Sequence, residues 1–346
     1  MHGTKMHVNQ PPKRILKPFA ASVATVLLLA LILCSSFLAS PPGSAEERQA
    51  AHLHRALAQS RFLAVDETAA ASASGGSNGR ALLKMLPFGG RLGDQMFMYA
   101  STLAVASRYN MDHCMVHSDL HRKALTTMFA GPFEFCEEGE FDISWNGGGG
   151  SGGQTDLTSF STEEAAQEGK AVGIYGFMHW ADNFMGIKDR VFKAFTLLPE
   201  MQTKADEYLK PYGDAVRVGI HVRRGDKQSM ASKWNAVYYE KAMDYFRKKY
   251  ATNGKQIIFI VASDGKDWIK AQEVFQKPDV KLIEGTPYQE DMAILINCDH
   301  GIVSGGGFGF WFAFLGPWQH GGEVIMNENQ EPWSRLEEWT FIEDVA

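Results

Sequence analysis

The stretch KQIIFIVAS, residues 255–263, places the strongest constraint on the fold of this 346-residue chain. Its apolar residues run on without the polar alternation of a half-exposed strand, so the stretch predicts a strand that is buried on both faces. Strands of this kind belong to parallel sheets that helices cover on each side. The fold therefore has to include helices that pack against both faces of a sheet.

Strand-like and helix-like stretches alternate along the rest of the chain beyond residue 80. We predict further strands within the stretches 80–88, 171–178, 216–222 and 300–305. Apolar residues at helical spacing predict helices within the stretches 94–109, 235–250, 290–298 and 309–318. This alternation predicts an α/β fold with parallel sheets. The length of the region suits two nucleotide-fold halves, residues 80–211 and 212–346.

An apolar segment of 21 residues without a charge, residues 19–39, lies near the start of the chain. About 20 apolar residues span a bilayer as a helix, and lysine and arginine precede the segment while glutamate follows it. We predict a cytosolic tail (1–18), a single-pass signal anchor (19–39) and an Ala/Ser/Gly-rich stem (40–79), with the globular part in the lumen. A cleaved signal peptide is the alternative, although its apolar core rarely exceeds about 15 residues.

The charge and the cysteines limit the partners and the redox setting. A net charge of −6 gives no general attraction to nucleic acid. Beyond Cys34 in the apolar segment, three cysteines remain, so at least one thiol has no partner within the chain. Pairing of Cys114 with Cys136 has the shortest sequence separation, but the spacing leaves the other pairings open.

The motif GIHVRRGD, residues 219–226, follows a predicted strand. Ligands of α/β sheets bind beyond the carboxyl ends of the strands, and arginine forks match phosphate oxygens. Arg223 and Arg224, with His221 before them, therefore predict a diphosphate site. The simpler alternative is a surface ion pair of either arginine with Asp226.

Three other turns follow predicted strands. The glycine-rich turns 89–96 and 304–311 each lead into a helix, whose first backbone amides are suited to an anion. Ser263 and Asp264 follow the strongest strand, where a carboxylate is placed to accept bonds from a base or a ribose. An N-cap role for Asp264 is an equal alternative. The glycine-rich stretch 146–159 lacks the Lys-Ser/Thr ending of a phosphate loop and predicts a flexible surface loop.

Metal chelation by paired aspartates is not expected. No two aspartates are separated by one residue, so the D-x-D arrangement that holds a divalent metal on a sugar nucleotide is missing. A leaving diphosphate would then be neutralised by cationic side chains, which the arginine pair can supply.

In their order along the chain, these segments resemble the galactoside α-1,2-fucosyltransferases over about residues 86–318. The segments that carry the resemblance are GRLGDQMFMYA, YGFMHWADNF (loosely), VGIHVRRGDK, FIVASDGKDW and EDMAILINCDHGIVSGGGFGFWFAFL. The resemblance implies a GT-B-type fold of two Rossmann-like halves. It also implies an inverting, metal-independent transfer of fucose from GDP-fucose to a galactose 2-hydroxyl of a glycan, in the Golgi.

The resemblance also implies roles for particular residues. Arg223 would bind the β-phosphate, with Arg224 and His221 in support. The full set of expected cofactor-binding positions is His221, Arg223, Ser263, Asp264, Ser304, Gly306, Phe308, Gly90, Arg91 and Gly93. We assign the catalytic role to Arg223, Arg224 and Asp226, the last as a general base. Asp94 is a second candidate base, and a dissociative transition state would need no strong base.

Three positions depart from the family pattern. Asp94 stands where the family has Asn, Gly307 where it has Thr or Ser, and Lys227 where it has an aromatic residue. We expect the first two to weaken nucleotide binding and the third to alter the acceptor side. Two alternatives stay open: a fucosyltransferase with another acceptor, and a non-catalytic relative that binds nucleotide or glycan.

Overall fold

The computed structural model describes residues 80–118, 122–146, 170–225, 235–251, 254–327 and 336–342. The predicted tail, anchor and stem lie outside these residues, as do almost all of the predicted loop 146–159, Asp226 and Lys227. Within the described ranges, no helix has the length and the apolar character needed to cross a membrane.

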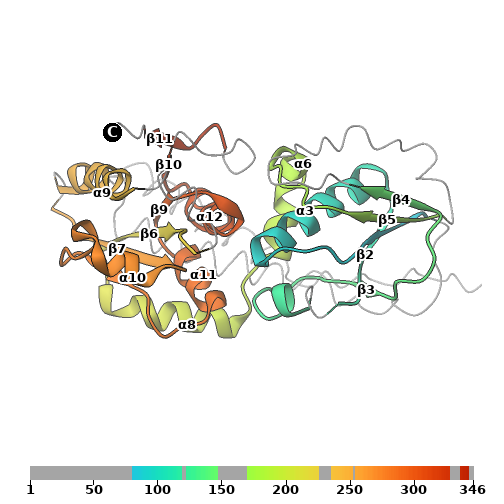
Figure 1. Ribbon diagram of the computed structural model, residues 1–346, viewed down its shortest axis with the longest axis horizontal. Coiled ribbons are helices and arrows are strands. Elements are labelled where there is room, and N and C mark those ends of the chain that lie inside the picture. Colours follow the sequence, from blue (N-terminus) through green and yellow to red (C-terminus); the bar gives the residue numbers. More distant parts are fainter. Residues whose placement is uncertain are drawn as a thin grey trace, which may run out of the picture. The chain divides into compact units, whose positions relative to one another are not determined.

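The first part of the fold is built on a five-stranded sheet in which all neighbouring strands are parallel. The strand order is β3-β2-β1-β5-β4, and Figure 1 colours these strands blue to green. The bounds are β1 Leu82–Met85, β2 Asp112–Val116, β3 Phe135–Cys136, β4 Ile143–Asn146 and β5 Ala171–Tyr175.

The second part is built on a six-stranded sheet, again with parallel neighbours throughout. Its strand order is β11-β10-β9-β6-β7-β8, coloured yellow to red in Figure 1. The bounds are β6 Val216–Val222, β7 Ile257–Ser263, β8 Val280–Leu282, β9 His300–Val303, β10 Val324–Asn327 and β11 Thr340–Ile342. The predicted α/β class with parallel sheets is confirmed.

Strand β7 shows why its sequence is continuously apolar. Phe259 and Val261 belong to the cluster formed with α9, whereas Ile258 and Ile260 belong to the cluster that contains residues of α11 and α12. Helices thus cover both faces of the strand, as the sequence predicted.

Helices fill the connections between the strands. The α-helices are α3 Leu92–Arg108, α6 Asp182–Met185, α7 Lys188–Ala194, α8 Pro199–Leu209, α9 Ala236–Ala251, α10 Lys266–Ala271, α11 Tyr288–Ile296 and α12 Gly306–Ala313. Shorter helical turns are η1 Arg122–Thr126, η3 Lys210–Tyr212, η5 Glu273–Phe275 and η6 Phe314–Trp318. Helix α8 precedes the boundary that we predicted near residue 211, yet it packs on α11, with Gln202 Nε2 donating to Asn297 Oδ1 at 2.8 Å.

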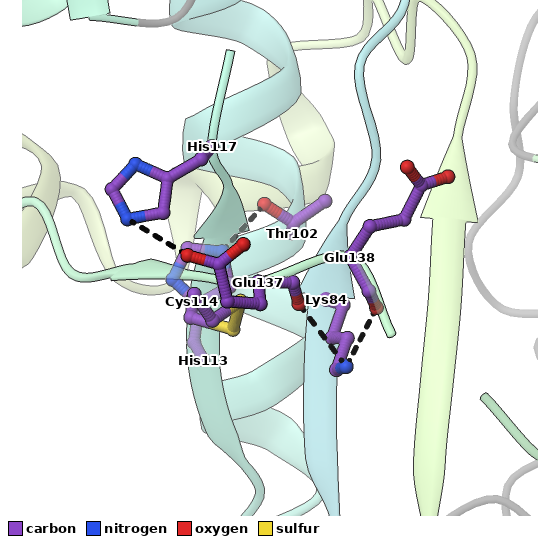
Figure 2. The surroundings of a disulfide bond; sticks show 8 residues. Lys84, Thr102, His113, Cys114, His117, Glu137 and Glu138 are labelled. Carbon is purple, nitrogen blue, oxygen red and sulfur yellow. Dashed lines mark hydrogen bonds and ion pairs between the residues drawn. A yellow bond between two sulfur atoms is a disulfide. The ribbon is translucent and has the colours of Figure 1, made fainter. Parts of the chain in front are cut away.

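A disulfide joins Cys114 on β2 to Cys136 on β3, the pairing of shortest sequence separation. Figure 2 shows Lys84 of β1 pointing to the backbone that follows Cys136, where its Nζ donates to the carbonyl oxygens of Glu138 at 2.8 Å and Glu137 at 3.3 Å. Cys298 is a buried thiol. The disulfide and the lysine together connect β3 and the segment after it to the centre of the first sheet.

Candidate functional site

The predicted site residues gather where strands of both sheets end. The turn after β1, the loop after β5, and the loops after β6, β7 and β9 each contribute a side chain or a helix start. Helices α3 and α12 pack against each other, so they hold the first and second sheets at one site. This is the edge at which α/β sheets bind ligands.

Ser304 fixes the backbone of the arginine motif. Its hydroxyl accepts a hydrogen bond from the Arg223 N–H at 2.9 Å and donates one to the His221 carbonyl at 3.0 Å. Ser304 is fully buried, so these bonds are shielded from water. The place of Ser304 along the phosphates stays a prediction, and its hydroxyl binds the loop that carries Arg223.

Asp264 holds the same loop from the other side. Its Oδ1 accepts hydrogen bonds from the N–H groups of Arg224 at 2.7 Å and Gly225 at 3.0 Å. The N-cap of α10 is Gly265, so the capping role that we considered for Asp264 is wrong. Ser263 stays local, with its hydroxyl accepting from the Gly265 N–H at 2.9 Å. Asp264 therefore ties the end of β7 to the end of β6.

The Arg223 side chain lies against the start of α12. A Cβ on Gly306 would come within 2.9 Å of Arg223 Nη1, so the guanidinium rests on this glycine. Gly305 and Gly306 both have positive φ, 91° and 76°, which glycine adopts without steric cost. A guanidinium beside the first amides of a helix is an arrangement suited to an anion.

Arg224 takes a different direction. Its guanidinium carbon lies 3.3 Å from the centre of the Trp268 ring, in a cation–π contact, and the residue is buried. Burial lowers the pKa of Arg224, and Tyr239 opposes that shift. The two adjacent arginines, which we predicted to act together on a diphosphate, are therefore directed to different places.

His221 is buried beside α12. Its ring stacks on Phe308 at 4.9 Å, and its Nδ1 would lie 2.9 Å from a Cβ on Gly309. Within the described part of the chain, that nitrogen has no hydrogen-bond partner. Burial lowers the pKa of His221 to about 3, with Asp264 opposing and Arg223 adding to the shift. The imidazole is neutral at physiological pH, so it packs behind Arg223 rather than adding a charge.

The turn after β1 supplies Gly90 and Arg91. Gly90 has a φ of 106°, and a Cβ there would collide with Asp94 at 2.5 Å. Asp94 Oδ2 accepts from the Arg91 N–H at 2.6 Å and so caps the first turn of α3. Arg91 Nη1 lies 3.8 Å from Asp264 Oδ2, an exposed contact that reaches from the first sheet to the second.

Asp94 also pairs with a histidine that the sequence analysis did not single out. Its Oδ1 lies 2.8 Å from Nε2 of His179, in the loop after β5. Burial raises the pKa of Asp94, but the hydrogen bond and charge of His179, the Arg91 N–H and the charge of Arg223 outweigh it, so the pKa is lowered overall. The only sequence signal was a histidine beside a tryptophan in the loosely matching segment YGFMHWADNF.

Gly93 and Gly307 are packing residues. A Cβ on Gly93 would lie 2.5 Å from the Gly307 carbonyl carbon, and a Cβ on Gly307 would lie 3.1 Å from Gly93. Trp311 Nε1 donates to the Gly93 carbonyl at 3.0 Å. A side chain at Gly307 would point toward α3, where its Cβ would make a tight contact with the Gly93 backbone. Close packing of the two helices therefore favours glycine at this position.

Among the residues that the structure describes, no group of three or more His, Cys, Asp or Glu side chains is placed to hold a metal ion. Asp226, our first candidate base, lies outside these residues.

Curated relatives share part of this sequence. Galactoside alpha-(1,2)-fucosyltransferase 1 of Aotus azarae is 30% identical over 259 residues, and that of Leontopithecus chrysomelas is 29% identical over 258. Each match covers 69% of this chain and 66% of the relative's own length.

Two solved structures match this chain at low sequence identity. A mutant of Arabidopsis thaliana FUT1 in complex with GDP matches 90% of this chain and 80% of its own, at a TM-score of 0.48 and 13% identity. NodZ alpha-1,6-fucosyltransferase co-crystallised with GDP matches 72% of this chain and 96% of its own chain, at a TM-score of 0.47 and 12% sequence identity.

The family model of glycosyl transferase family 11 matches residues 170–343, half of the chain. The matched residues include the arginine motif, the Asp264 turn and the glycine-rich start of α12. The chain therefore belongs to glycosyl transferase family 11.

Proposed function

We propose that this protein is an inverting fucosyltransferase that moves fucose from GDP-fucose to the 2-hydroxyl of a galactose in a glycan. The observation that carries the proposal is the Arg223 guanidinium resting on Gly306 at the start of α12, at the carboxyl end of β6. Family membership and relatives named galactoside alpha-(1,2)-fucosyltransferase support the choice of sugar, linkage and acceptor.

Arg223 and the first amides of α12 would bind the diphosphate of GDP-fucose. Negative charge develops there as the bond between fucose C1 and the phosphate oxygen breaks, so cations fixed in advance lower the barrier. Ser304 and Asp264 keep the loop backbone in place, and His221 fills the space behind it without adding charge. We retain a metal-free reaction because the chain lacks a D-x-D motif.

We further propose a GT-B-type architecture, with residues 80–211 on the acceptor side and residues 212–346 binding the nucleotide sugar. The apolar segment 19–39 would anchor the protein as a single-pass type II membrane protein of the Golgi, with the stem 40–79 holding the catalytic part in the lumen. Asp226 remains a candidate base in this proposal.

GDP release tests the function directly. Protein from about Gly79 onward is incubated with GDP-fucose and EDTA, with and without a panel of β-galactosides. We expect galactoside-dependent release and a fucosylated product. Binding of GDP without release would contradict the proposal in favour of a non-catalytic relative, and turnover on other acceptors alone would contradict the choice of galactose.

Arg223→Ala tests the residue that carries the proposal. We expect transfer to fall by about 10²–10³-fold, the usual loss when a transition-state charge partner is removed. Arg190→Ala is the matched control, because Arg190 contacts Ser107 on the first part of the fold. Equal turnover by Arg223→Ala and wild-type protein would refute the assignment.

A further inference from the structure

The pair formed by Asp94 and His179 lies beside the proposed diphosphate site but is not needed to bind a diphosphate. The two residues come from different strand ends and lie 85 positions apart in the sequence. Asp94 follows Gly93, which packs against Gly307 at the start of α12, so Asp94 lies near the proposed leaving group. Both side chains remain partly accessible, with 13% of the His179 side chain and 25% of the Asp94 side chain exposed.

The carboxylate of Asp94 is held as an anion with a fixed direction. Oδ2 accepts from the Arg91 N–H at 2.6 Å, and Oδ1 faces His179 Nε2 at 2.8 Å. Asp94 also lies in the first turn of α3, where the helix dipole favours a negative charge. These contacts keep Asp94 ionised, which suits it to receive an N–H from imidazole.

The His179 ring is held on two sides by aromatic residues. It stacks on Phe177 at 5.0 Å with an angle of 26° between the planes, and it meets the edge of Phe97 at 5.2 Å. With Nε2 at 2.8 Å from a carboxylate oxygen, the neutral imidazole favours its proton on Nε2, which leaves the lone pair on Nδ1. This is the arrangement by which a carboxylate orients a histidine base and stabilises the imidazolium that forms.

We infer that His179 is the general base of the transfer, taking the proton of the acceptor hydroxyl on Nδ1, and that Asp94 is its positioning residue. The inference rests on the proposed function. As the acceptor oxygen bonds to fucose C1, the C1–phosphate oxygen bond breaks and its electron pair leaves with GDP. The hydroxyl proton passes to His179, and the imidazolium later returns it to solvent.

The experiment compares two substitutions of His179 by steady-state transfer from GDP-fucose to a β-galactoside. His179→Ala removes the imidazole, and His179→Gln keeps an N–H donor toward Asp94 without a base. We expect kcat to fall by about 10²–10⁴-fold in both, the usual contribution of a general base. The affinity for GDP, measured by titration, is expected to stay at the wild-type value, and added imidazole should restore part of the kcat of His179→Ala.

Asp94→Asn tests the positioning residue. The amide oxygen of the new side chain still accepts from the Arg91 N–H, but the neutral amide is a poor partner for an imidazolium, so we expect kcat to fall at least about tenfold without a loss of GDP affinity. His117→Ala is the matched control, since this histidine is half-exposed and stacks on Phe135 in the first sheet. Its kcat should equal that of wild-type protein.

The outcomes separate the two proposals. Transfer by wild-type protein with full kcat in His179→Gln would overturn the base and leave the fucosyltransferase proposal standing. Loss in His179→Ala that is repaired in His179→Gln and not by imidazole would assign His179 a structural role. Binding of GDP by wild-type protein without transfer to any galactoside would overturn the proposed function and the base with it.

Discussion

Arg223 and Arg224 are neighbours in the sequence, but their side chains are in different surroundings. Arg223 rests on Gly306, while Arg224 is buried with its guanidinium over Trp268. Charge matters at the first position because an anion can approach it. At the second position the flat shape of the guanidinium matters as well, because it stacks on an aromatic ring.

Arg224→Lys separates these roles. Lysine keeps the charge but loses the planar stacking on Trp268, so we expect the free energy of unfolding to fall by about 1 kcal/mol. Urea unfolding measures that loss, and titration with GDP should show no comparable loss of affinity. Arg223→Lys is the matched variant: lysine keeps the charge but loses the fork that matches phosphate oxygens, so we expect GDP affinity to fall while stability is kept. A similar loss of GDP affinity in both would show that Arg224 also contacts the nucleotide.

The sequence predicted where the candidate residues lie in the fold better than it predicted their contacts. Placing the arginine motif at a strand end followed from the position of the apolar run before it. The contacts of Asp264 with the loop after β6 could not be predicted, because residues 40 apart become neighbours only through strand pairing. The pairing of Asp94 with His179 was hidden for the same reason.

At the scale of elements, the contact of α3 with α12 brings the ends of the two sheets together. Two glycines allow their backbones to approach, and Trp311 donates to the backbone of α3 across the contact. Phe97 on α3 packs against Phe310 and Trp311 on α12, at 4.8 and 5.0 Å between ring centres. The position of the start of α12, and with it the proposed anion site, therefore depends on this contact.

Gly93→Ala tests the contact. The new Cβ would lie 2.5 Å from the backbone of Gly307, and backbone cannot move aside cheaply. We expect the free energy of unfolding to fall by about 2 kcal/mol, as for other overpacked sites, together with a lower kcat/KM. Gly89→Ala is the control, because a Cβ there meets nothing within 4 Å. Equal stability of the two variants in urea would contradict the proposed packing.

The disulfide between β2 and β3 gives a second prediction for an element. Its cysteines are 22 positions apart, and closing a loop of that size removes about 3 kcal/mol of conformational entropy from the unfolded chain. We expect the double change of Cys114→Ser and Cys136→Ser to lose about that stability. A reducing agent should lower the free energy of unfolding of the wild-type protein and of Cys298→Ala, and it should leave that of the double variant unchanged.

Long elements were predictable and short ones were not. The helices α3 and α9 and the strands β6 and β7 carry enough apolar residues to show a period. Strand β3 has two residues and β8 and β11 have three, too few for any pattern to appear. Strand β2 begins with the polar residues Asp112 and His113, so its sequence does not show the apolar pattern of its buried second half. These strands take their conformation from the neighbours with which they pair.

At the scale of the whole molecule, loss of hydration favours the neutral form of several histidines: His221 is buried, and His113 and His300 are partly buried. Burial lowers the pKa of His113 to about 4, with Arg190 adding to the shift. The pKa of His221 is lowered to about 3, and that of His300 is also lowered by burial, against the opposing charges of Asp299 and Glu323. The folded protein therefore takes up fewer protons than the unfolded chain in mildly acidic solution.

This difference in proton uptake predicts a loss of stability at mildly acidic pH. A histidine in the unfolded chain has a pKa near 6.5. Below that pH the unfolded chain binds protons that the folded protein does not bind, so the free energy of unfolding falls. The free energy of unfolding stops falling only when the pH is below the pKa values of these histidines in the folded protein. From pH 7.5 to pH 5.5, His113 and His221 together should cost about 3 kcal/mol.

Urea unfolding at the two pH values measures the loss, and His113→Gln is expected to reduce it by about half, because glutamine retains a polar group beside Thr102 but cannot titrate. The lowered pKa values of Asp94 and Asp299 affect the free energy of unfolding in a separate, more acidic pH range. Their contribution is present above the carboxylates' unfolded values near 4 and is lost only as the pH falls through their folded values. A free energy of unfolding that stays level between pH 7.5 and 5.5 would show that the buried histidines accept protons without unfolding.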